Sequence, residues 1–132
     1  MAQVALEVPG ALVPCVRETV VLQYRAAGEA LHLAFGEAES GDARRERERL
    51  AGIGAMLDQL GWPGEPVPAA PRLSAPAELV RDALHGSLID AGERLAVACE
   101  AGWRGEASAD SVRSAAGEVI GLDRLLRGLE AG

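Results

Sequence analysis

The amino-acid sequence predicts an all-α protein: an up-down four-helix bundle built from two similar helical hairpins joined by a proline-rich crossover. In four separate stretches, apolar residues recur every three or four positions, which is the spacing of one buried helical face. Prolines, glycines and capping residues separate these stretches. The chain of 132 residues is 48% hydrophobic, so one domain of this length buries a core without needing a disulfide or a metal.

The segment 12–61 is expected to form the first hairpin, after an extended arm over residues 1–11. A helix tolerates proline only in its first turn, so the first helix starts near Pro14. It runs to about Phe35, because Gly36 provides a helix stop. The apolar face of this helix comprises Val13, Val16, Val20, Ala27, Leu31 and Ala34.

The second helix is expected to open at Ser40 or Asp42, since both residues are good N-caps. Gly61, followed by Trp62 and a proline, ends it. The apolar face of this helix comprises Leu50, Ile53, Leu57 and Leu60. The crossover over residues 62–74 contains four prolines, so it is extended and stiff.

The segment 75–132 is expected to form the second hairpin. Ser74 caps its first helix, with Pro76 inside the first turn and Gly102 near the end. Ser108 caps its second helix. The two apolar faces comprise Val80, Leu84, Leu88, Ala91, Leu95 and Ala98, and then Val112, Ala115, Val119, Leu122, Leu126 and Leu129.

The first and third predicted helices resemble each other at a constant offset of 64 positions. Val16-Arg17-Glu18 matches Val80-Arg81-Asp82, and Ala27-Gly28-Glu29 matches Ala91-Gly92-Glu93. We interpret the match as an internal duplication. Glycine inside a helix costs about 1 kcal/mol relative to alanine, so Gly28 and Gly92 indicate a close approach of neighbouring helices or, alternatively, a binding notch.

Composition argues against several classes of protein. The net charge is −7 and only 3% of residues are aromatic, which disfavours nucleic-acid binding. No apolar run is long enough to span a bilayer, and the residues before Arg17 lack the basic start of a signal peptide. Two cysteines without zinc-like spacing fit free thiols in the cytoplasm. All basic residues are arginine and 25 residues are alanine, a composition typical of a high-GC bacterial genome.

Glu29 and His32 have the i, i+3 spacing of the metal ligands in carboxylate bundles, and Asp82 with His85 repeats that spacing. Both pairs lie away from the apolar faces, whereas a metal site in a bundle faces inward. We therefore predict no metal, cofactor or catalytic residue, and keep a metal or small-ligand site with Glu29, His32 and His85 as an alternative. Glu46 is unusual because it falls on the apolar face of the second helix. We expect it to reach solvent as a helix-end residue, and the alternative is a polar group at the mouth of the bundle that pairs with an arginine.

A second apolar row on the first helix predicts an interface. Cys15, Leu22, Ala26 and Leu33 are spaced by 7, 4 and 7 residues, so they lie on one line about 140° from the core face. We expect this row to form a homo-oligomer, most simply a two-fold dimer, unless the arm or the crossover covers it. The sequence thus predicts a non-enzymatic protein acting through protein–protein contacts. An accessory subunit of an enzyme is a further alternative.

Overall fold

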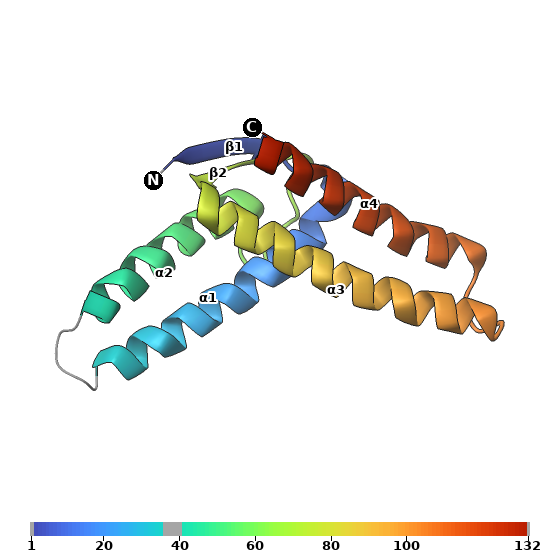
Figure 1. Ribbon diagram of the computed structural model, residues 1–132, viewed down its shortest axis with the longest axis horizontal. Coiled ribbons are helices and arrows are strands. Elements are labelled where there is room, and N and C mark those ends of the chain that lie inside the picture. Colours follow the sequence, from blue (N-terminus) through green and yellow to red (C-terminus); the bar gives the residue numbers. More distant parts are fainter. Residues whose placement is uncertain (1, 36–40, 132) are drawn as a thin grey trace. The chain divides into compact units, whose positions relative to one another are not determined.

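The computed structural model describes residues 2–35 and 41–131. Its elements are β1 (Gln3–Glu7), the 3-10 helix η1 (Gly10–Leu12), α1 (Val13–Phe35), α2 (Gly41–Leu60), β2 (Arg72–Pro76), α3 (Ala77–Trp103) and α4 (Ala109–Ala131). The described chain is therefore mostly helical, as predicted, with a small two-stranded sheet that was not expected (Figure 1). Gly36 and Ser40, the expected end of one helix and cap of the next, lie outside the described residues.

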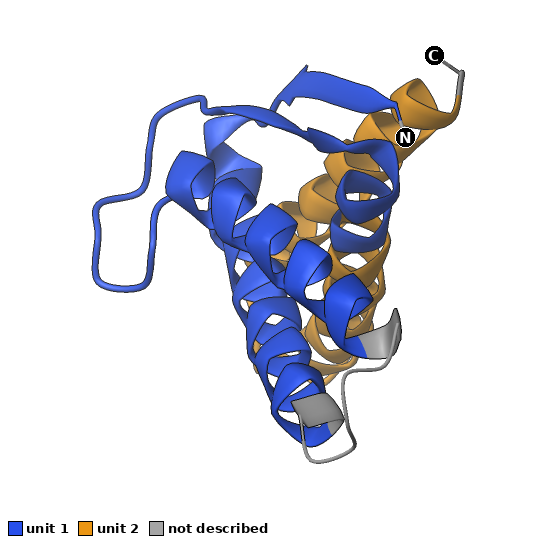
Figure 2. Cartoon of the chain, turned by 90° about the vertical axis from the view of Figure 1, so that its left-hand side faces the viewer, with its two compact units in different colours: residues 1–83 blue, residues 84–132 orange. Residues whose placement is uncertain are grey.

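The chain divides into two compact units, residues 1–83 and residues 84–132 (Figure 2). The boundary falls inside α3, so this helix contributes its first turns to one unit and the remainder to the other. The first unit holds the sheet, α1 and α2, and the second holds most of α3 together with α4.

The N-terminal residues form a strand rather than an unpaired arm. β1 pairs antiparallel with β2, and Leu6 lies opposite Leu73 while Val4 lies opposite Ala75. Leu73 and Ala75 are buried, and the residues between and before them are exposed, the alternation expected of a sheet with one covered face. The prediction that Ser74 caps the third helix, with Pro76 in its first turn, is therefore wrong, because both residues belong to β2 and α3 begins at Ala77.

A side chain of α2 completes the free edge of β2. Gln59 Nε2 donates to the carbonyl oxygen of Ser74 at 2.9 Å, and the Ser74 amide donates to Gln59 Oε1 at 2.6 Å. The amide group thus makes the pair of hydrogen bonds that a neighbouring strand would make. An exposed strand edge otherwise presents unpaired backbone groups, so Gln59 ties the sheet to α2.

The ends of α1 and α2 follow the predicted chemistry. Pro14 lies in the first turn of α1, where its missing N–H does not break a helical hydrogen bond. α2 ends at Leu60, and Gly61 has a φ of +92°, a conformation that glycine adopts without strain. The Gly61 amide donates to the carbonyl oxygen of Leu57 at 2.8 Å, which closes the last turn of α2.

The core of the first unit is concentrated near the sheet, whereas the sequence predicts a buried face along the whole length of each helix. α1 packs along α2, and α2 also packs on β2. Within the described part of this unit, the fully buried large side chains include Val16, Val20, Ile53, Met56, Leu57, Leu60 and Leu73. Leu31 and Leu50, farther along the hairpin from the sheet, are only half-buried and line an open groove between α1 and α2. The prediction that Leu31 belongs to the buried face of the first helix therefore holds only in part.

In the second unit, α3 and α4 form a helical hairpin. The Ser111 amide donates to Ser108 Oγ at 3.2 Å, which confirms Ser108 as the N-cap of α4. Farther along, Arg94 of α3 forms an ion pair with Glu118 of α4 at 3.2 Å. Trp103 at the end of α3 is 92% exposed, so it does not cover a core.

Residues matched at the offset of 64 have similar burial. Val16 and Val80 are both fully buried, and Leu31 and Leu95 are both half-buried. Leu33 is 74% exposed and its counterpart Val97 is 68% exposed. The duplication itself stays a prediction.

None of the helices in the described ranges is both long and apolar enough to cross a lipid bilayer.

Replacing Gln59 with alanine is expected to destabilise the first unit by about 1–3 kcal/mol, because two backbone groups of Ser74 lose their partner. The measurement is the free energy of unfolding from urea titration followed by circular dichroism. The exposed Gln3 of β1 provides the control, since Gln3→Ala should change stability by less than about 0.5 kcal/mol. Equal effects of the two substitutions would contradict a structural role for the Gln59 amide.

Leu57→Ala is expected to destabilise the protein by about 2–5 kcal/mol, because it opens a cavity at a fully buried position. Leu31→Ala should have a clearly smaller effect, because that side chain is only partly buried. Denaturant titrations of the two variants test the order. If Leu31→Ala proved the more damaging change, the core would extend to the far end of the α1–α2 hairpin.

Candidate functional site

The exposed face of α1 carries two large apolar side chains. Leu22 is 53% exposed and Leu33 is 74% exposed, and Ala26 between them is also exposed. Eleven residues of helix separate the two leucines, which corresponds to about 16 Å along the axis. At 100° per residue the leucines differ by about 20° around the helix, so they lie on one line as predicted.

Cys15 does not belong to this exposed row, and that part of the prediction is wrong. The residue is only 7% exposed, and Leu12, Val13 and Val16 around it are buried as well. The first turns of α1 are therefore covered on several sides, whereas the sequence predicts one covered face along the whole helix. The exposed row begins at Leu22, beyond the buried first turns of α1.

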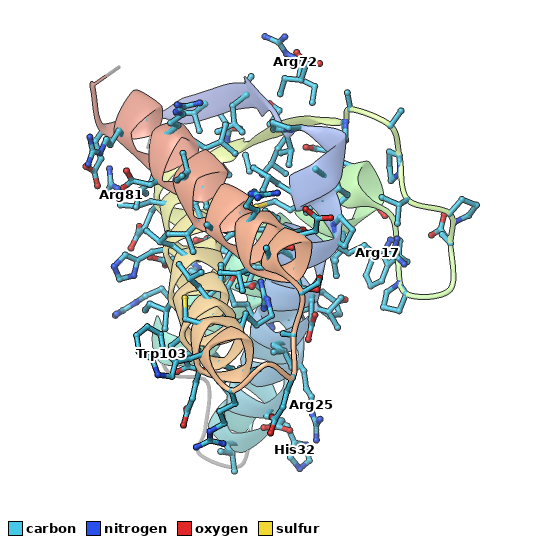
Figure 3. All side chains as sticks on the ribbon, turned by 90° about the vertical axis from the view of Figure 1, so that its right-hand side faces the viewer. Arg17, Arg25, His32, Arg72, Arg81 and Trp103 are labelled. Atoms are coloured by element: carbon cyan, nitrogen blue, oxygen red, sulfur yellow. The ribbon has the colours of Figure 1, made fainter. Side chains whose placement is uncertain are left out.

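Charged side chains border the row on one side. Arg25 Nε donates to Glu29 Oε1 at 3.4 Å, and these side chains are 77% and 68% exposed. His32 is exposed on the same border, and Figure 3 shows Arg25 and His32 projecting from the same part of α1. Arg25, Glu29 and His32 line a shallow hollow with Gly28 and Leu33.

Gly28 does not serve a close approach of helices in this structure. A β-carbon built at Gly28 has no neighbouring atom within 4 Å, and the same holds for Gly92. The preferred interpretation of these two glycines, as points of close helix packing, is therefore wrong for the described chain. At Gly28 the missing side chain instead helps to leave the surface of α1 hollow beside Leu33.

The proline-rich segment lies beside the other end of the row. Arg17 donates from Nη1 to the carbonyl oxygen of Glu65 at 3.1 Å, and Figure 3 shows Arg17 next to the loop that follows α2. The walls of the resulting hollow of about 450 Å³ are mostly apolar and include Pro14, Val21, Leu22, Pro63 and Val67. The alternative that the crossover covers the row thus holds only in part, because Leu22 and Val67 remain about half exposed.

Val67 is an exposed residue that was not predicted from the sequence. It is 48% exposed and lies between Pro66 and Pro68. Its signal in the sequence was a single branched apolar residue within a stiff, proline-rich segment. Val67 adds a second exposed apolar side chain at the edge of the same hollow as Leu22.

The three alternative metal ligands do not form one described site. Glu29 and His32 lie together on the exposed side of α1, where Glu29 pairs with Arg25. His85 is also exposed and belongs to the second unit. Among the described residues, no three histidine, cysteine or acidic side chains are grouped closely enough to hold a metal ion.

Glu46 lies in a separate cleft between α2 and the start of α3, lined also by Arg45, Arg49, Glu78 and Asp82. Its Oε2 atom is buried and has no hydrogen-bond partner within the described structure. The position on the apolar face of α2 explains the burial. The expectation that Glu46 simply reaches solvent at a helix end is therefore wrong for this oxygen.

Comparisons of this chain with models of protein families, with curated proteins and with solved structures found no match.

The burial of Cys15 predicts a large difference in thiol reactivity. Cys99 is exposed and should react quickly with 5,5′-dithiobis(2-nitrobenzoic acid), whereas Cys15 should react only when the first unit opens. The folded protein should thus show one fast thiol, and denaturant should release the second. The Cys99→Ser variant isolates the slow reaction. A fast reaction of that variant would contradict the burial of Cys15 and would mean that its thiol lies on the exposed face of α1.

Proposed function

We propose that this protein is a non-enzymatic helical protein that acts through protein–protein contacts and forms a homodimer through the exposed face of α1. The interface consists of Leu22, Ala26 and Leu33, with the charged border of Arg25 and Glu29. Cys15 is left out because it is buried.

The exposure of Leu22 and Leu33 on one line is the observation that carries this proposal. Burying a leucine side chain is worth about 1.5–3 kcal/mol relative to leaving it in water. Isolated exposed leucines are common on soluble proteins, but a row of apolar side chains along a helix is typical of a contact surface. The row is long enough for a helix–helix contact, because its leucines are about 16 Å apart.

We further propose that the dimer works in a reducing compartment, the cytoplasm. Two cysteines that form no disulfide with each other support this location. The role as an accessory subunit of an enzyme differs from this proposal in one respect: the partner on α1 would then be a different chain.

Light scattering of the purified protein at micromolar concentration tests the proposal. The expected mass is twice the 13.7 kDa of one chain. The double variant Leu22→Glu plus Leu33→Glu should be a monomer, because it places four carboxylates in the apolar contact of a dimer. Circular dichroism should show an unchanged helix content, since both side chains are exposed.

A matched control is available on the second unit. Ile89 and Ile120 are 53% and 52% exposed, close to the exposure of Leu22, so Ile89→Glu plus Ile120→Glu adds the same charge without touching α1. This control should remain a dimer. A wild-type monomer would overturn the proposal, and loss of the dimer in the control alone would place the interface on the second unit.

A further inference from the structure

We infer that the second copy docks on α1 in the antiparallel direction, with Leu22 of each copy against Leu33 of the other and Arg25 of each copy facing Glu29 of the other. This inference rests on the proposed homodimer and adds its orientation and register. All residues on the exposed side of α1 belong to the first unit.

The two sides of the leucine row differ in charge. Taking Leu22 as the reference and 100° per residue, Arg25 lies about 60° and Glu29 about 20° to one side. Ala26 lies about 40° to the other side, and Ala30 follows it about 80° from the reference. One flank of the row is therefore charged and the other flank carries alanines.

This asymmetry selects the direction of the second helix. When two helices pair antiparallel about a two-fold axis, each flank faces the same flank of the partner, so the charged flanks meet. In a parallel pair, the charged flank of one copy would face Ala26 and Ala30 of the other. Only the antiparallel pair therefore brings Arg25 and Glu29 of the two copies together.

The leucines and the charges agree on one register. If Leu22 of one copy is level with Leu33 of the other, Arg25 is level with Ala30 of the second copy, one residue from Glu29. Ala26 falls level with Glu29 of the second copy, and its small side chain permits a close approach of the helices. Each Arg25–Glu29 pair within a helix, now 3.4 Å long and mostly exposed, becomes part of a four-charge cluster at the centre of the contact.

Cysteine cross-linking measures this register. In a Cys99→Ser background, chains carrying Leu22→Cys are mixed with chains carrying Leu33→Cys under mild oxidation. The mixture should give a disulfide-linked dimer, because positions 22 and 33 of opposite copies are level. Each variant alone should give none, since its two cysteines lie about 16 Å apart along the axis and a disulfide requires Cα atoms within about 7 Å.

A charge exchange provides an independent measurement that keeps both leucines. Chains with Arg25→Glu and chains with Glu29→Arg should each dimerise more weakly than wild type, and their mixture should favour the mixed dimer by about fivefold. The exchange Arg113→Glu mixed with Asp110→Arg on α4, another exposed ion pair, is the matched control and should show no preference.

The outcomes separate the inference from the function on which it rests. A cross-link formed by Leu22→Cys alone would mean a parallel pair or another register, while the homodimer would stand. A dimer that forms no cross-link in any of these mixtures would mean a different face. A monomer in light scattering would overturn both proposals.

Discussion

The backbone pairing between β1 and β2 is the constraint on which the first unit depends. It joins the start of the chain to the segment before α3, and the ladder is extended at both ends by hydrogen bonds from Val8 to Pro71 and from Ala77 to Ala2. α1 therefore starts near one end of this small sheet, and α3 starts at the opposite end. Gln59 fixes that sheet to α2. This short sheet thus positions the start of α1, the start of α3 and the end of α2. The densest burial in the described part of this unit lies nearby, which leaves the far end of the α1–α2 hairpin with half-buried leucines.

The helices were predictable because their chemistry is local. Pro14, Gly61 and Ser108 act within one turn of where they stand, and each lies where the sequence places it. The strand pair was not predictable in the same way. Residues 3–7 alternate like a strand, but the partner segment Arg72–Pro76 contains Ser74 and Pro76, which also resemble the start of a helix. The choice between these structures depends on a contact between segments far apart in the chain.

The candidate site was predictable where α1 stands clear of other elements and not where it is enclosed. Leu22 and Leu33 are exposed as the helical period predicts. Cys15 lies on the same line of the helix, but it is buried in the first turns of α1. Periodicity gives the direction of a side chain around a helix. It does not say how many neighbouring elements surround that part of the helix, and for α1 the proline-rich segment and η1 decide this near its start.

The two tryptophans of the chain stand in opposite surroundings, one in each unit. Trp62 packs edge-to-face on Tyr24 with ring centroids 5.3 Å apart, and its indole nitrogen donates to Asp58 at 2.6 Å. Trp103 is almost fully in water already. Unfolding therefore changes the environment of Trp62 far more than that of Trp103, so the shift in intrinsic fluorescence on denaturation follows the first unit alone. Circular dichroism at the same denaturant concentrations includes the helices of both units, and the difference between the two optical curves gives the stability of the second unit without any label.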